Sequence, residues 1–270
     1  MKLSHLTEKL KSCGIENARG EAYILFSHFG HIRREDMIGT DPEIDDTLIE
    51  DALARRLKRE PLQHIIGEVD FYREHYKVSP DCLIPREDTE ILVDLAVRML
   101  PEGVRFVDLC TGSGCVAIST LKNTKSTTAV AVDISEGALA MARINAHENG
   151  VGERLDLRLR DALADTVEGE IFAVLSNPPY IKEEVYSTLE PELYFEPKIA
   201  LVGFGDEGAG FYDRITELYR DKISEGGFLA YEIGYDQADI LSRIAEKYAM
   251  KIEIIKDFSG NPRVALLRRK

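Results

Sequence analysis

The 270-residue chain contains no tryptophan, only four cysteines, and no run of eighteen consecutive apolar residues. Cys13, Cys82, Cys110 and Cys115 form no CxxC pair and are too few to cross-link a small secreted domain, so a reducing compartment is favoured. The first lysines are not followed by an apolar segment, which argues against a classical signal peptide, and the missing long apolar run argues against a membrane-spanning helix. We therefore expect a cytoplasmic protein without membrane contact.

An excess of positive charge is also missing. The 34 Lys and Arg residues are outnumbered by 48 Asp and Glu residues, which gives a formal net charge of −14. Such a surface raises the cost of approaching a polyphosphate, so nucleic acid is not expected as a partner. The one notable basic run, Arg55, Arg56, Lys58 and Arg59, is interpreted either as a solvated helix face or as a local binding patch.

The apolar pattern divides the chain into three parts. Residues 1–62 have apolar positions only at helical spacing and predict a small helical bundle, whereas residues 63–80 alternate and predict a β-hairpin linker. Residues 81–270 predict an α/β fold with a doubly wound, largely parallel sheet. The strands are expected at 104–109, 127–133, 155–159, 171–176, 226–233, 251–256 and 263–268, and the helices at 88–99, 114–122, 135–148, 208–223 and 235–248.

The connection between the last two predicted strands is short. Four residues, Ser259–Pro262, separate them, which is too few for a parallel crossover. We therefore expect the last strand to pair in the antiparallel direction.

A glycine-rich turn follows the first predicted strand of this sheet, which ends at Leu109. Gly112 and Gly114 permit positive φ and a close approach of ligand to backbone, and Ala117 takes the small third position of a GxGxx(G/A) pattern. Asp133 ends the next strand, 21 residues after Gly112, where a carboxylate can accept both hydroxyls of a ribose. The spacing predicts a nucleoside-bearing cofactor, with a simple tight turn as the alternative.

The position of Asp108 helps to decide between two classes of cofactor, a dinucleotide and S-adenosylmethionine. A dinucleotide places its pyrophosphate at the helix N-terminus, where a nearby anion is unfavourable, yet Asp108 stands directly before the loop. An acid at that point suits a cationic ligand such as S-adenosylmethionine, which carries an ammonium and a sulfonium. Asp108 can equally organise the loop by accepting hydrogen bonds from backbone amides.

A second loop, Asn-Pro-Pro-Tyr, begins at Asn177 after the strand predicted at 171–176. A conjugated amino group is a poor nucleophile unless acceptors hold its two hydrogens and its lone pair faces an electrophile. Asn177 offers a side-chain oxygen and Pro178 a carbonyl, and Pro178 and Pro179 restrict the backbone. The ring of Tyr180 can pack on the planar group and favour positive charge on nitrogen. The motif predicts methyl transfer to a planar amino group, with a rigid Pro-Pro turn as the alternative.

Further motifs narrow the interpretation. They are Pro61–Gly67, Phe71–Tyr72, Val78–Pro80, Leu83–Glu90, Glu232–Gly234 with Gln237, Lys256–Asp257, Gly260–Asn261 and Arg263–Val264. Together with the two loops they resemble the HemK/PrmC family of class I methyltransferases, protein-(glutamine-N5) methyltransferases that modify peptide-chain release factors. The chain departs from the family pattern at Cys110, where glycine is usual, at Glu87, where proline is common, and at Phe258, Ser259 and Pro262.

The resemblance implies a substrate, a cofactor and a set of site residues. The substrate is the glutamine of the Gly-Gly-Gln loop in class 1 peptide-chain release factors, the cofactor is S-adenosyl-L-methionine, and the N-terminal helices contact the protein partner. No metal is expected. The catalytic residues are expected to be Asn177, Pro178 and Tyr180. The residues expected to bind the cofactor are Asp108, Cys110, Thr111, Gly112, Ser113, Gly114, Asp133, Ile134, Asp161, Ala162 and Asn177, and those expected to bind substrate are Asn177, Pro178, Pro179, Tyr180, Arg86 and Thr89.

Several alternatives stay open at this point. Arg86 and Thr89 precede a predicted helix, so they either cover the cofactor or serve as surface charge and helix cap. Cys110 is interpreted as a small apolar filler rather than a reactive thiol. The spacing does not separate a glutamine amide from the amino group of adenine or guanine in DNA or RNA. A non-catalytic binder of a translation factor and an NAD-dependent oxidoreductase are further alternatives.

Overall fold

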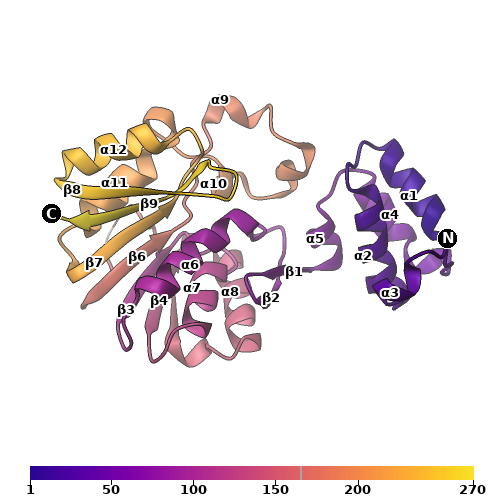
Figure 1. Cartoon of the computed structure of the whole chain (residues 1–270), viewed down its shortest axis with the longest axis horizontal. Helices are drawn as coiled ribbons and strands as arrows, with labels where there is room; N and C mark the ends of the chain where they lie inside the picture. Colours follow the sequence, from indigo (N-terminus) through magenta and orange to yellow (C-terminus); the bar gives the residue numbers. More distant parts are fainter. Residues whose placement is uncertain (165) are drawn as a thin grey trace. The chain divides into compact units, whose positions relative to one another are not determined.

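A computed structural model describes residues 1–164 and 166–270 (Figure 1). Contacts between residues divide the chain into two compact units. The first unit contains Met1–Glu68 and the distant segment Glu190–Phe195, and the second contains Val69–Leu189 and Glu196–Lys270. In these described ranges, no helix has the length and apolar character needed to cross a membrane.

The first unit is helical, which confirms the predicted bundle. Its core contains side chains that are wholly buried, among them Leu6, Leu25 and Phe26. Leu48 is 50% exposed, because its segment forms a single 3₁₀ turn at Asp46–Leu48. The helices are α1 (Leu3–Ser12), α2 (Ala18–Gly30), α3 (Arg34–Met37), α4 (Glu50–Arg56) and α5 (Leu62–Ile66).

Most of the basic run is paired inside this unit. The Arg56 guanidinium is 5% exposed and donates to Glu21 at 2.6 and 3.1 Å and to Glu192 at 3.0 Å. Arg55 pairs with Glu60, and Arg59 also pairs with Glu192. Arg56, which belongs to α4, therefore links the segment Glu190–Phe195 to α2. The three arginines do not form an unpaired basic patch.

Adjacent arginines of α4 provide a matched test of this arrangement. Arg56→Ala is expected to destabilise the first unit by about 2 kcal/mol, because two carboxylates that still reach some water lose their shared cation. Arg55 is 36% exposed and pairs with Glu60, so Arg55→Ala is expected to cost less than about 1 kcal/mol. Hydrogen exchange of the α2 and α4 amides measures the stability of this unit separately. Equal losses in the two variants would contradict the assigned role of Arg56.

The second unit contains a seven-stranded sheet with strand order β5-β4-β3-β6-β7-β9-β8 among the described residues. A separate two-stranded hairpin, β1 (Glu68–Phe71) and β2 (Glu74–Lys77), forms within the predicted range 63–80. The start of that range was predicted wrongly, because its first residues belong to the helix α5. The strands of the large sheet are β3 (Arg105–Leu109), β4 (Thr128–Asp133), β5 (Leu155–Leu159), β6 (Ile171–Ser176), β7 (Ile223–Glu232), β8 (Met250–Lys256) and β9 (Pro262–Arg269).

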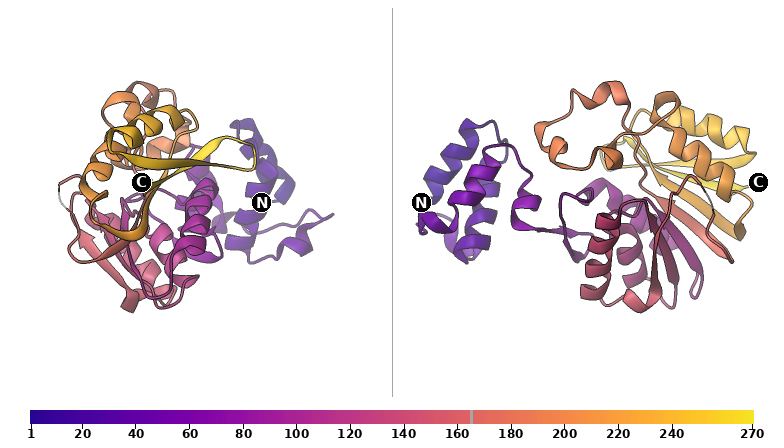
Figure 2. Two further views of the ribbon diagram at one scale, coloured as in Figure 1. Left: turned by 60° about the vertical axis from the view of Figure 1, so that its left-hand side comes forward. Right: turned by 180° about the vertical axis from the view of Figure 1, so that it is seen from behind.

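Helices cover both faces of the sheet (Figure 2). Alternate strand residues point to opposite faces, so Phe106 packs against one set of helices and Val107 against the other. One face carries α6 (Glu90–Met99), α7 (Cys115–Lys122) and α8 (Glu136–Glu148), and the other carries α11 (Gly210–Tyr219) and α12 (Ala238–Lys247). This confirms the predicted doubly wound α/β fold.

The last strand is antiparallel, as predicted. β9 inserts between β7 and β8 and pairs antiparallel with both. The predicted helix 208–223 is shorter, at Gly210–Tyr219, because Ile223 already begins β7 and pairs with Ile171. The short helices α9 (Glu183–Tyr186) and α10 (Lys198–Leu201) between β6 and α11 were not predicted, since each is only four residues long.

Candidate active site

The two loops identified in the sequence begin side by side in the middle of the sheet. β3 and β6 are parallel neighbours, Leu109 pairs with Ser176, and the Ser176 hydroxyl donates to the Leu109 carbonyl at 2.6 Å. Cys110 and Asn177 are therefore the first residues beyond the same sheet edge. The chain order reverses between these two strands, and ligands of open α/β sheets bind at such switch points.

The glycine loop requires a left-handed backbone at several positions. Gly114 has φ +82°, and a Cβ there would lie 2.8 Å from Ile118 Cδ1 and 3.2 Å from the Ala142 Cβ. Cys110 has φ +59° although it is not glycine. Because a side chain in this conformation costs roughly 1 kcal/mol, the usual preference for glycine at this position has a direct backbone reason.

Asp108 lies beneath the loop rather than in the cavity. Its carboxylate is 1% exposed and accepts hydrogen bonds from the Thr111 hydroxyl at 2.5 Å and from the Ala117 amide at 3.2 Å. Burial raises the pKa of Asp108 to about 7. These contacts fit the interpretation in which Asp108 organises the loop, because strand alternation turns its side chain toward α7.

Asp133 holds the loop from the neighbouring strand. One carboxylate oxygen accepts from the Gly112 amide at 2.9 Å and the other from the Ser135 amide at 3.0 Å. Burial raises the pKa of this carboxyl above its usual value. The Ile134 amide also hydrogen-bonds to this carboxylate. An ionised carboxylate has about four acceptor positions, so at least one stays available to a ligand.

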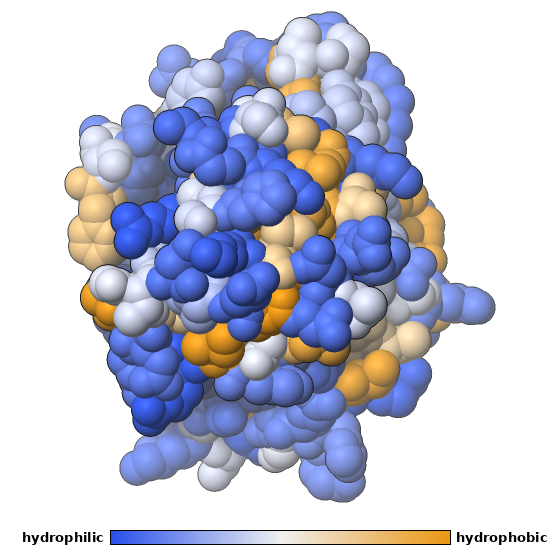
Figure 3. All heavy atoms as spheres, turned by 90° about the vertical axis from the view of Figure 1, so that its right-hand side faces the viewer, coloured by the Kyte–Doolittle hydropathy of each residue, from blue (hydrophilic) through white to orange (hydrophobic). Residues whose placement is uncertain are grey.

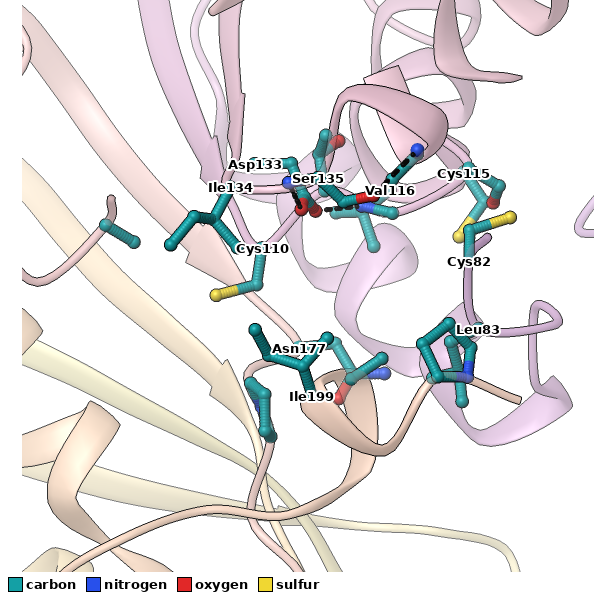
Figure 4. Close-up of a pocket in the computed structure, with 18 of the residues that line it drawn as sticks. Cys82, Leu83, Cys110, Cys115, Val116, Asp133, Ile134, Ser135, Asn177 and Ile199 are labelled. Carbon is teal, nitrogen blue, oxygen red and sulfur yellow. Dashed lines mark hydrogen bonds between the residues drawn. The ribbon is translucent and has the colours of Figure 1, made fainter. Parts of the chain in front are cut away.

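A cavity of about 270 Å³ lies along this edge of the sheet. Figure 4 shows Asp133 and Ile134 on one side of it and Asn177 and Ile199 on the other. Of the described residues predicted for the site, those that line the cavity are Arg86, Thr89, Cys110, Thr111, Gly112, Ser113, Asp133, Ile134, Asp161, Ala162, Asn177 and Pro179. The others, Asp108, Gly114, Pro178 and Tyr180, lie outside its lining.

The lining of the cavity also contains residues that the site prediction did not include, and two segments stand out among them. One contains Cys82 and Ile84, and the other contains Pro197 and Ile199. Glu196 connects them, because its buried carboxylate accepts from the Ile84 amide at 2.8 Å and forms an ion pair with Arg86. The first segment overlaps a motif of the family resemblance, whereas no pattern marks Pro197 or Ile199.

A buried carboxylate at the end of β7 organises the second loop. The Thr89 hydroxyl donates to Glu232 at 2.5 Å, and the Asn177 amide group donates to the Thr89 oxygen at 3.2 Å. The Tyr180 hydroxyl donates to the other Glu232 oxygen at 3.3 Å. Thr89 occupies the N-cap position of α6, as the alternative interpretation expected, but its side chain caps no backbone amide and is bonded to Glu232 instead. Glu232 stood in a resemblance motif but was not predicted for the site.

The fold and this site define a methyltransferase. Residues 88–192 match the family of methyltransferase small domains. The crystal structure of the ribosomal protein L11 methylase of Lactobacillus delbrueckii subsp. bulgaricus superimposes with a TM-score of 0.53 and 20% identity, covering 72% of this chain and 84% of that one. That likeness concerns the fold.

The sequence relatives identify the family within this class. Residues 2–67 match the PrmC N-terminal domain. A release factor glutamine methyltransferase of Thermodesulfovibrio yellowstonii is 36% identical, with 92% of each chain covered. One of Nitratidesulfovibrio vulgaris is 34% identical over 99% of this chain and 94% of the relative. The chain belongs to the release factor glutamine methyltransferase family, as its motifs predicted.

Proposed function

We propose that the chain transfers a methyl group from S-adenosylmethionine to the side-chain amide nitrogen of the glutamine in the Gly-Gly-Gln loop of class 1 peptide-chain release factors. The proposal includes a cytoplasmic site of action. It is supported by family membership and, in the structure, by one observation above all. The Asn177 carboxamide lines the cavity with its NH2 group bound to Thr89, so its oxygen is left for a substrate amide.

The residues around the cavity fit the proposed cofactor. The volume of about 270 Å³ is near the lower end of ligand pockets, which begin at roughly 300 Å³. Asp133 has acceptor positions for ribose hydroxyls, and Ile134 and Ala162 provide an apolar surface for a planar base. When bound, S-adenosylmethionine supplies a methyl group activated by a positively charged sulfur. The cavity lining contributes orientation and exclusion of water.

The Asn-Pro-Pro-Tyr loop would hold the methyl acceptor. The Asn177 side-chain oxygen and the Pro178 carbonyl are assigned to the two hydrogens of the glutamine amide, which turns the nitrogen lone pair toward the donor. Glu232 anchors the Tyr180 hydroxyl and so restrains the ring that would flank the amide. Direct transfer in this arrangement gains its rate from orientation and from electrostatics aimed at the transition state. The nitrogen forms its bond to the methyl as the sulfur–methyl bond breaks, and one amide proton is then released, so the products would be the N5-methylglutamine protein, S-adenosyl-L-homocysteine and a proton.

The N-terminal helices are proposed to contact the release factor. Ile24, Ile38 and Leu48 of this unit expose 45%, 69% and 50% of their surface. Figure 3 shows a face of the molecule on which apolar residues form small groups among hydrophilic ones. These exposed apolar side chains are the proposed contact positions, since the buried core of a protein–protein interface is more apolar than its rim.

Methyl-labelled S-adenosylmethionine tests the proposed function. The chain is incubated separately with a class 1 release factor, DNA and ribosomal RNA, and peptide mass spectrometry locates the label. We expect transfer to the Gly-Gly-Gln glutamine and none to a release factor with that glutamine replaced. Label on a nucleic acid alone would support an adenine or guanine methyltransferase instead, and binding without transfer would support a non-catalytic role.

A further inference from the structure

Glu232 is a buried carboxylate whose role the proposed chemistry does not explain. It ends β7, is 2% exposed, and lies within the second unit. Burying a carboxylate is costly unless its oxygens are hydrogen-bonded. Both oxygens are bonded here, and both partners, Thr89 and Tyr180, belong to segments of the candidate active site.

Asn177 in the cavity donates a hydrogen bond to Thr89, and Thr89 donates one to the Glu232 carboxylate. An ionised carboxylate can only accept, so Thr89 must donate its single hydroxyl hydrogen to Glu232. The Thr89 oxygen then has only lone pairs left, and Asn177 can approach it only with its NH2 group. The Asn177 oxygen is consequently turned away from Thr89.

We propose that Glu232 is a positioning residue, which sets through Thr89 the orientation of the Asn177 carboxamide so that an acceptor faces the methyl-accepting amide. This inference rests on the proposed function, since it specifies how that function obtains its acceptor. Without the carboxylate, either end of the Asn177 side chain could face Thr89, because a hydroxyl can both donate and accept.

The surroundings of Glu232 let it change protonation near neutral pH. The nearby cation Arg263 favours the ionised form of Glu232, but it is already paired with Asp88 and Asp257 at 3.2 Å each. Burial therefore dominates and raises the pKa of Glu232 from 4.5 to about 7. The titratable and charged groups facing it are Arg263 from β9, Asp88 before α6, Tyr180 after β6, Tyr212 from α11 and Cys115 from α7.

Protonation and substitution should have the same effect on the direction of the hydrogen bonds. A protonated Glu232, or Gln in Glu232→Gln, can donate to the Thr89 oxygen. The Thr89 hydroxyl can then donate to the Asn177 oxygen, which turns the Asn177 NH2 toward the substrate. A donor then faces the amide hydrogens where an acceptor is needed.

The proposal predicts how kcat for methyl transfer by the full chain depends on pH and on Glu232. Wild-type kcat should fall as the pH drops below about 7, because the carboxylate is then protonated. Glu232→Gln should lower kcat by about 10- to 30-fold and remove this acid limb, with little change in cofactor affinity. The loss is smaller than for removal of Asn177, since the flipped carboxamide can still turn back.

The stability of the protein should change with pH in the direction opposite to kcat. The folded-state pKa lies above the unfolded value of 4.5, so between these values the folded chain keeps a proton that the unfolded chain has lost. The contribution of Glu232 to stability therefore falls as the pH rises toward 7, while activity rises. A merely structural Glu232 would give the change in stability without the acid limb in kcat.

Glu74→Gln is a matched control. Glu74 is also a buried carboxylate, and it accepts from the Ser119 hydroxyl at 2.7 Å and the Asn123 amide at 3.1 Å, outside the cavity lining. Its substitution should leave the pH profile of kcat unchanged. A second pair of variants covers the case in which Glu232→Gln fails to fold. Thr89→Val removes the hydroxyl and should lose kcat, whereas Thr89→Ser keeps it and should lose far less.

The experiment measures methyl transfer from labelled S-adenosylmethionine to the release factor from about pH 5 to about pH 9. An acid limb present in the wild type and in Glu74→Gln but absent in Glu232→Gln supports the inference. A wild-type kcat and acid limb in Glu232→Gln, or equal activities of Thr89→Val and Thr89→Ser, overturn it. No transfer by the wild-type chain would instead overturn the proposed function.

Discussion

Asn177→Ala is expected to lower kcat by roughly 30- to 1,000-fold, about 2 to 4 kcal/mol of transition-state stabilisation. The variant keeps the proline-restricted loop but loses the side-chain oxygen that would accept from the substrate amide. Its effect should appear in the chemical step, because the acceptor interaction strengthens as the nitrogen lone pair attacks. Single-turnover methyl transfer measures the rate, and calorimetry with S-adenosylmethionine should give a dissociation constant close to that of the wild type.

Asn149→Ala is the control for loss of an asparagine side chain. Asn149 donates to the His75 and Asn145 carbonyls and lies outside the cavity lining, so its substitution should leave kcat unchanged. If Asn177→Ala turned over as fast as this control, the methyl acceptor would have to be held by other groups and the proposed mechanism would be discarded.

Asp133→Ala is expected to weaken S-adenosylmethionine binding by about 100-fold. The substitution has two consequences for the cofactor site. It removes the acceptors proposed for the ribose hydroxyls, and it leaves the Gly112 and Ser135 amides without the carboxylate that orders the loop. Calorimetry measures the dissociation constant, and kcat at saturating cofactor should change much less than the affinity.

Asp133→Asn separates the two consequences. The asparagine keeps one acceptor oxygen but presents an NH2 group where the other oxygen stood, so binding should lie between that of wild type and Asp133→Ala. Because burial already raises the pKa of Asp133, wild-type affinity should also decline in acid as the carboxylate is neutralised. An unchanged dissociation constant in Asp133→Ala would show that the ribose is held elsewhere.

Local patterns in the sequence predicted most of the fold. The strand at Ile171–Ser176 was predicted to the residue, and the helices on both faces were predicted to within a few residues at most ends. These elements follow from apolar periodicity, which depends on neighbours in sequence. The loop chemistry was predicted for the same reason, since Gly112, Gly114 and the tetrapeptide at Asn177 follow directly after strands.

Other parts of the site depend on contacts between distant residues. Glu196 is 112 residues from Ile84, and Glu232 is 143 residues from Thr89. No periodicity indicates which of 48 acidic residues becomes buried against which hydroxyl or amide. Asp108 illustrates the same limit, because its position before the loop allowed either a cofactor contact or a structural role until the orientation of its strand was known.

The sequence by itself therefore determined the α/β architecture, the family and the two loops that meet at the switch point. Only the tertiary structure decided that Glu232 anchors Thr89 and Tyr180, that Glu196 joins two walls of the cavity, and that Arg56 is buried rather than solvated. The reason is physical. Backbone geometry and apolar spacing act over a few residues, whereas the partner of a buried charge is chosen by packing across the whole unit.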